Sequence, residues 1–335
     1  MSELDSLPRV AVLATGGTIA GAADDLGSAG YSSGVLGVDE LVAAVPRVAE
    51  LARLEGAEIA RVGSQDMSDA IWLDLAREIL LRLEPASDLA GIVVTHGTDT
   101  LEETAYFLDL VVPDEVPVVV TGAMRPATGL SADGPRNLLD SVRVSIHLEA
   151  VDRGVLVVLD ETIHTARGVT KTNTSHVSTF QSPELGVAGK IVAGRPVFFR
   201  PAPPRLSREA RFELDGVDVL PRVDVIYAHA GVEEDLVASS IDRGARGIVL
   251  AGVGNGNAPA RLLQSLAEAV RLGVPVVRSS RTSSGFVARN VEVDDDALGF
   301  VAAGDLNPAK SRVLLKLALL GGNDPRRLQD LFFAP

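Results

Sequence analysis

The stretch GIVVTHGTDTLEE, residues 91–103, decides the fold that the sequence predicts. Its apolar run Ile92–Val94 is typical of a buried strand in a parallel sheet, and a helical pattern begins soon after it. Thr98 and Asp99 therefore lie on a strand-to-helix turn. Ligands of open α/β sheets bind at such turns, because backbone N–H groups and the helix dipole point into the crevice. A hydroxyl beside a carboxylate at this position predicts that the two side chains take part in a reaction.

A purely structural interpretation of the same turn competes with this one. Thr98 and Asp99 belong to the residue types that most often cap helices, and two capping boxes fit the spacing, Thr100 with Glu103 and Asp99 with Glu102. A second stretch of sequence favours the functional interpretation over the structural one. The apolar run Val10–Ala14 leads into TGGTIAG (residues 15–21), where paired glycines let a ligand approach the backbone beside a threonine.

These two stretches resemble the signature motifs of bacterial-type L-asparaginases, in the asparaginase/glutaminase family. The resemblance covers nearly the whole chain, in the order of the family. The other motifs that carry it are GSQDM (63–67), TGAMRP (121–126), SADGPRNL (131–138), VTKTNT (169–174), AGVGNGN (251–257) and VRSSR (277–281).

Strand and helix patterns alternate through the first half of the chain, which predicts a parallel sheet covered on both faces. Five prolines between Arg195 and Pro221 indicate an extended linker, and a second alternating set begins at Val223 and ends in a final helix from Pro308 to about Leu320. We therefore expect an α/β protein with two α/β domains. The N-terminal, flavodoxin-like domain is the larger (1–200); a proline-rich linker (201–220) and a smaller C-terminal domain (221–335) follow.

Composition narrows the partners and cofactors. A net charge of −14 argues against nucleic acid and anionic membranes, and no long apolar stretch indicates a membrane span. The chain has no cysteine, and its five histidines show no metal-ligand spacing, so we expect neither a metal nor an organic cofactor. His96 is interpreted as a hydrogen-bonded structural residue. No basic segment followed by an apolar one is visible at the start of the sequence, which favours the cytoplasm.

The resemblance implies hydrolysis of L-asparagine to L-aspartate and ammonia by a threonine nucleophile through an acyl-enzyme. It pairs Thr18 with Tyr31 and Glu292, and Thr98 with Lys171. Threonine is a weak nucleophile and needs such neighbours. We expect Thr18 to attack, Thr98 to donate its backbone N–H to the oxyanion, and Lys171 to hold geometry and charge beside Asp99. Which threonine attacks first is left open.

The resemblance also implies the substrate contacts. Asp99 and Glu292 would meet the α-ammonium group with Gln65, and Ser64 would meet the α-carboxylate. Asn257 and Glu292 would come from a neighbouring subunit of a homotetramer with shared sites.

Two other classes of protein remain as alternatives, the ammonia-generating subunit of a tRNA-dependent amidotransferase and a non-enzymatic amino-acid-binding protein. The preference between asparagine and glutamine is open, because one methylene changes discrimination by only about 1–3 kcal/mol.

Overall fold

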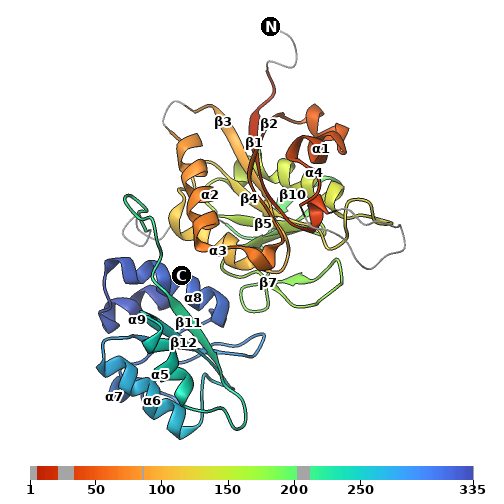
Figure 1. The fold of residues 1–335 in the computed structure, drawn as a ribbon. Helices are drawn as coiled ribbons and strands as arrows, with labels where there is room; N and C mark the ends of the chain where they lie inside the picture. Colours follow the sequence, from red (N-terminus) through yellow and green to blue (C-terminus); the bar gives the residue numbers. More distant parts are fainter. Residues whose placement is uncertain (1–5, 22–33, 85–86, 202–211, 335) are drawn as a thin grey trace. The chain divides into compact units, whose positions relative to one another are not determined.

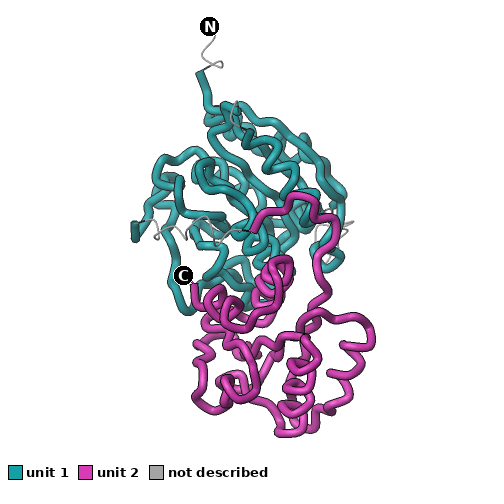
Figure 2. Tube along the Cα trace, turned by 90° about the vertical axis from the view of Figure 1, so that its left-hand side faces the viewer, with its two compact units in different colours: residues 1–205 teal, residues 206–335 magenta. Residues whose placement is uncertain are grey.

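A computed structural model describes residues 6–21, 34–84, 87–201 and 212–334. The chain divides into two compact units, residues 1–205 and 206–335 (Figure 2, teal and magenta). Each unit has its own mainly parallel sheet with helices packed on it. The predicted α/β class, with a larger N-terminal and a smaller C-terminal domain, is confirmed.

The sheet of the N-terminal unit contains eight strands within the described residues, in the order β10-β9-β6-β5-β4-β3-β1-β2. Its parallel part consists of β1 (Arg9–Gly16), β2 (Arg53–Val62), β3 (Leu89–Thr95), β4 (Val118–Thr121) and β5 (Leu156–Leu159). Antiparallel strands extend it: β6 (Thr162–Thr165), β9 (Gly189–Val192) and β10 (Arg195–Phe198). A separate small hairpin consists of β7 (Thr170–Lys171) and β8 (Phe180–Gln181).

The prediction that the extended linker starts at Arg195 is wrong. Residues Arg195–Phe198 form β10, which pairs with β9 at the edge of the sheet. Pro196 is compatible with this position because an edge strand leaves one row of its N–H groups unpaired. Proline density alone therefore indicated too early an end to regular structure.

Helices cover both faces of this sheet (Figure 1). One face carries α1 (Val38–Ala43) and α4 (Gly134–Ser145), where Val10 and Val93 pack with Leu138 and Val142. The other face carries α2 (Asp69–Arg82) and α3 (Leu101–Val111), whose Trp72 and Phe107 rings stack with centroids 5.2 Å apart. Side chains of a strand alternate between faces, so His96, three residues after Val93, belongs to the face of α2 and α3.

The starts of α2 and α3 are capped differently. Ser68 caps α2, because its hydroxyl accepts a hydrogen bond from the Ile71 N–H at 3.4 Å. Both capping boxes predicted for α3 are wrong: Thr100 is the N-cap residue, but its side chain makes no capping bond. The Thr100 hydroxyl instead donates to the carbonyl of Ser64 at 2.7 Å, which ties α3 to the turn after β2.

The sheet of the C-terminal unit is parallel, in the order β11-β12-β13-β14. Its strands are β11 (Val223–Tyr227), β12 (Gly247–Gly252), β13 (Val276–Ser280) and β14 (Val301–Ala302). Its helices are α5 (Asp235–Asp242), α6 (Ala260–Arg271), α7 (Asp295–Leu298), α8 (Pro308–Ala318) and α9 (Pro325–Phe333). The core contains Ile248 and Leu250 of β12 against Leu262 and Leu266 of α6.

The helix predicted to be the last one is followed by another. A short 3-10 turn, Leu319–Gly321, follows α8, and α9 begins after Asp324, whose side chain accepts the Arg327 N–H at 2.8 Å. The sequence carried this signal, an aspartate N-cap followed by proline at the first helical position.

Candidate active site

The turns that carry Thr18, Ser64 and Thr98 follow the carboxyl ends of β1, β2 and β3. Gly16 of β1 pairs with Val62 of β2, and Thr95 pairs with Ala14 on one side and Thr121 on the other. The carboxyl ends of these four strands are thus level. Short 3-10 turns follow two of them, Thr18–Ala20 after β1 and Ser64–Asp66 after β2.

The turns after β1 and β3 touch through their glycines. Gly17 has φ of 82°, and a Cβ atom added to it would lie 2.2 Å from the Gly97 nitrogen. A Cβ on Gly97 would lie 2.7 Å from the Ser64 Oγ. Only glycine permits this approach, and it brings Thr18 and Thr98, each the residue after one of these glycines, to one place. Both threonines are buried.

Lys171 links Thr98 to Asp99. Its Nζ lies 2.9 Å from the Thr98 Oγ1 and 2.6 Å from the Asp99 Oδ1. The lysine side chain is 16% exposed and the Asp99 side chain 60%, so the ion pair opens to solvent on the side of the carboxylate. The Lys171 backbone N–H donates to Glu102 at 2.8 Å, which fixes the small hairpin to the first turn of α3. An ammonium group donating to a hydroxyl oxygen stabilises negative charge that develops there.

Ser64 occupies the next turn and is also buried. Its Oγ accepts the Asp99 N–H at 3.0 Å. A serine hydroxyl has one hydrogen to donate, and no described residue accepts it, so this hydrogen is available to a ligand anion. The neighbouring Gln65 is exposed, and its amide Nε2 lies 3.2 Å from the Asp66 carboxylate.

His96 is fully buried and hydrogen-bonded, as predicted. Its Nδ1 lies 2.6 Å from the Gly97 carbonyl oxygen, and its Nε2 lies 2.8 Å from the Thr104 hydroxyl. Burial lowers the pKa of His96 to about 4, although the hydrogen bond to Gly97 acts in the opposite direction. The imidazole is therefore neutral near pH 7 and is poorly suited to take up a proton there.

Asn257 and Glu292 lie together in the C-terminal unit, where the Asn257 Nδ2 donates to the Glu292 Oε2 at 3.0 Å. The structure thus brings the predicted residues together in two groups, one in each unit. Tyr31, the remaining predicted residue, lies outside the described residues.

A buried arginine holds the loops that carry Asn257 and Glu292, and sequence reasoning missed it. Arg278 forms two hydrogen bonds with Asp295, at 2.6 and 2.7 Å, and both side chains are fully buried. It also donates to the Asn255 carbonyl at 2.8 Å, while Asp295 accepts the Asn290 N–H at 2.8 Å. The available signal was a charged residue directly after the apolar pair Val276 and Val277.

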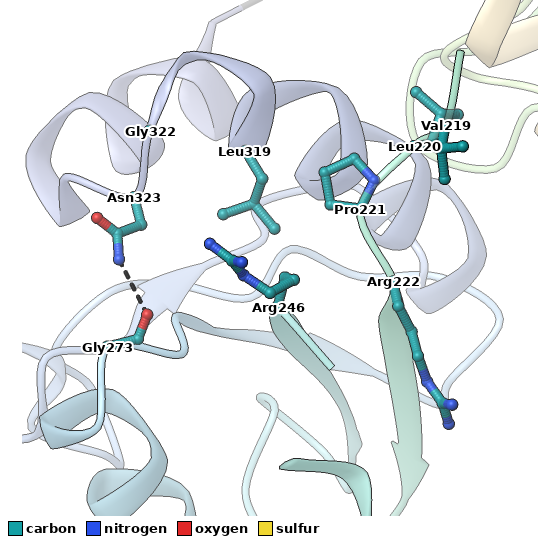
Figure 3. Close-up of a pocket in the computed structure, with 9 residues that line it drawn as sticks. All are labelled: Val219, Leu220, Pro221, Arg222, Arg246, Gly273, Leu319, Gly322 and Asn323. Carbon is teal, nitrogen blue, oxygen red and sulfur yellow. Dashed lines mark hydrogen bonds between the residues drawn. The ribbon is translucent and has the colours of Figure 1, made fainter. Parts of the chain in front are cut away.

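A pocket in the C-terminal unit offers a different surface (Figure 3). Leu220, Arg246, Leu319 and Asn323 are among its lining residues, and the Asn323 amide donates to the Gly273 carbonyl at 2.9 Å. The described residues that line it supply neither a hydroxyl nor a carboxylate. The described lining of this pocket therefore lacks the hydroxyl and carboxylate groups that the threonine turns provide.

Comparison with known proteins agrees with the motifs. Residues 9–204 match the family model "Asparaginase, N-terminal", and residues 222–332 match "Glutaminase/Asparaginase C-terminal domain". L-asparaginase 2 of Escherichia coli strain K12 is 44% identical over 327 residues, covering 98% of this chain and 93% of the relative. The probable periplasmic L-asparaginase of Haemophilus influenzae is 45% identical, covering 97% and 93%.

A solved structure agrees at the level of the fold. The probable cytoplasmic L-asparaginase of Campylobacter jejuni superposes with a TM-score of 0.92 at 42% identity, covering 97% of this chain and 99% of that one. The resemblance drawn from the motifs is confirmed, and the chain belongs to the asparaginase family.

Proposed function

We propose that this chain is an L-asparaginase, which hydrolyses L-asparagine to L-aspartate and ammonia. The observation that carries the proposal is the position of the Lys171 ammonium between the Thr98 hydroxyl and the Asp99 carboxylate. The turn that carries Thr98 and Asp99 touches the turn that carries Thr18. Membership of the asparaginase family supports the same reaction. A binding protein has no need of two buried threonines on touching turns, one of them hydrogen-bonded to a lysine.

We assign the attack to Thr18. Its Oγ bonds to the side-chain carboxamide carbon, the hydroxyl proton passes to the departing nitrogen, and the C–N bond breaks to release ammonia. Water then hydrolyses the resulting ester and returns the proton to Thr18. The Thr98 N–H stabilises the oxyanion in both steps, and Tyr31 serves Thr18 as a proton-transfer partner.

Recognition of the amino acid follows from charge. The Ser64 hydroxyl donates to the α-carboxylate, whereas Asp99 and Glu292 attract the α-ammonium group together with the Gln65 side-chain oxygen. Asn257 holds the Glu292 carboxylate in place. L-glutamine is proposed as a second substrate, since one additional methylene changes binding by only about 1–3 kcal/mol.

We further propose a homotetramer in which Asn257 and Glu292 complete the site of a neighbouring chain. Inactive Thr18→Ala and weakened Glu292→Ala proteins, unfolded and refolded together, should then regain activity. Random pairing makes about half of the dimers hybrid, each with one intact site. Activity no higher than the average of the separately refolded variants would refute sharing.

The cytoplasm is proposed as the location, and fractionation of cells expressing the full chain tests it. Two of the three relatives described above carry a compartment in their names, periplasmic for the Haemophilus influenzae protein and cytoplasmic for the Campylobacter jejuni protein. Among the described helices, none combines the length and apolar character needed to cross a bilayer.

The direct test of the function is release of ammonia by the purified protein given asparagine alone. Thr18→Ala and Thr98→Ala should each lower kcat by about a thousandfold or more, with circular dichroism unchanged. Thr162→Ala, a threonine of the antiparallel part of the sheet, is the matched control and should stay active. No ammonia from the wild-type protein would favour an amidotransferase subunit, which needs a partner, or a binding protein.

A further inference from the structure

A chain of hydrogen bonds connects α2 to the peptide between Gly97 and Thr98. The Trp72 Nε1 lies 2.8 Å from the Thr104 Oγ1, which in turn lies 2.8 Å from the His96 Nε2. The His96 Nδ1 lies 2.6 Å from the Gly97 carbonyl oxygen. Trp72, Thr104 and His96 are all buried. None of these three side chains has a role in the proposed mechanism.

The direction of every bond in this chain is fixed by chemistry. A carbonyl oxygen only accepts, so the His96 Nδ1 carries the ring hydrogen. An indole N–H only donates, so the Thr104 oxygen accepts from Trp72 and directs its own hydrogen to the His96 Nε2. The neutral ring that this pattern requires agrees with a pKa of about 4 for the buried His96. The imidazole consequently has one tautomer and one orientation.

The bond to Gly97 also determines where the Thr98 N–H points. In a trans peptide the carbonyl and the following N–H point in opposite directions, and no cis peptide occurs among the described residues. Because His96 holds the Gly97 oxygen on the side of α2 and α3, the Thr98 N–H faces the other way.

This N–H has no hydrogen-bond partner among the described residues, although Thr98 is only 5% exposed. Buried N–H groups without a partner are rare in folded proteins. This donor is therefore available to an acceptor atom of a ligand.

We propose that His96, held by Thr104 and Trp72, is a positioning residue that aims the Thr98 N–H at the oxyanion. The inference rests on the proposed function, in which that N–H stabilises negative charge. His96 transfers no proton and does not touch the substrate. It acts by preventing rotation of the peptide plane during the reaction.

Two substitutions at His96 distinguish loss of the hydrogen bond to Gly97 from a mere change in side-chain size. Asparagine places its amide nitrogen near the position of Nδ1, so His96→Asn keeps the donor to the Gly97 carbonyl. Glutamine places its amide nitrogen near Nε2, so His96→Gln loses that donor. Removing an oxyanion donor lowers kcat by about 10²–10³-fold, and a misaimed donor should cost less, about 10–100-fold in the Gln variant, with KM for asparagine little changed. The Asn variant should recover at least about tenfold of that loss.

A second pair decides the outcome if both His96 variants fold poorly. Thr104→Val removes the hydroxyl that orients the ring, whereas Thr104→Ser keeps it, so only the Val variant should lose kcat. Ile79→Ala is the stability control, because Ile79 is a buried residue of α2 that takes no part in these hydrogen bonds. This variant should keep its kcat at temperatures below its melting temperature.

The possible results separate the inference from the function on which it rests. Equal kcat losses within each pair, or a wild-type kcat in His96→Gln and Thr104→Val, would overturn the inference alone, provided that Thr98→Ala is inactive. A wild-type protein that releases no ammonia would overturn the proposed function, and the inference with it.

Discussion

Acid should destabilise this protein through His96 by an amount that the structure allows us to calculate. The ordinary pKa of histidine is 6.5, and burial lowers that of His96 to about 4. Between these pH values the unfolded chain binds a proton at His96 and the folded chain does not. The free energy of unfolding therefore falls as the pH falls, and it levels off below about pH 4. One pH unit corresponds to about 1.36 kcal/mol, which gives a total loss of about 3 kcal/mol, with about 2 kcal/mol already lost at pH 5.

The assay is urea unfolding from pH 7.5 to 4 at a fixed protein concentration, with His96→Asn as the comparison. Carboxylates titrate in both proteins, so the difference in unfolding free energy between them isolates the imidazole. The advantage of the wild-type protein over the variant should shrink by about 3 kcal/mol on acidification. Ile79→Ala, which removes no titrating group, should run parallel to the wild type. A difference between wild type and His96→Asn that is independent of pH, or that grows in acid, would refute the reasoning.

Three further changes test other parts of the structure. Gly17→Ala should abolish activity and lower the melting temperature strongly, because its Cβ would lie 2.2 Å from a backbone nitrogen, whereas Gly216→Ala, with φ of 70° and open space, should cost only about 1 kcal/mol in thermal unfolding. Asp295→Asn leaves a buried guanidinium without its charge partner and should cost about 3–5 kcal/mol, whereas Glu268→Gln, which breaks an exposed ion pair, should cost less than about 1 kcal/mol in urea unfolding. Lys171→Met should lower kcat by about a hundredfold or more and leave the melting temperature nearly unchanged, because its carboxylate partner is largely exposed.

The parallel core could be predicted because its strands are short apolar runs that the structure buries on both faces. Val10–Ala14 and Ile92–Val94 both lie in buried strands where the sequence placed them. The prediction failed at the sheet edge, since Arg195–Phe198 lacks that apolar pattern and becomes a strand only by pairing with β9. Pairing across a hairpin is a tertiary fact that a local pattern does not contain.

The candidate site shows the same division. The motifs identify Thr98, Asp99 and Lys171, and the resemblance predicted that they act together. The sequence could not predict which hydrogen-bond partners the neighbouring polar residues have in the fold. Thr100 fits a capping box by spacing, yet it donates to the Ser64 carbonyl, because the turn after β2 lies within reach only once the sheet has formed.

The series of hydrogen bonds from Trp72 through Thr104 to His96 likewise forms only once the fold has brought these residues together. Its members are separated by up to 32 residues, and ring tautomers follow from their partners. Burial of a histidine could be expected from sequence, but the direction in which it holds a neighbouring peptide could not. The histidine in the signature motif was therefore interpretable as structural and not as a positioning residue.

In the proposed site, Ser64 couples binding of the substrate α-carboxylate to the geometry of the turn that carries Thr98. Its oxygen accepts the Asp99 N–H while its hydrogen remains for a ligand anion, so the two bonds share one hydroxyl. Donating to an anion makes that oxygen a better acceptor, because successive hydrogen bonds polarise one another. A carboxylate bound at Ser64 thus tightens the turn that carries Thr98, and a stiffer turn in return binds the carboxylate better. An uncharged analogue of the α-carboxylate would lose this reciprocal gain as well as its own contact.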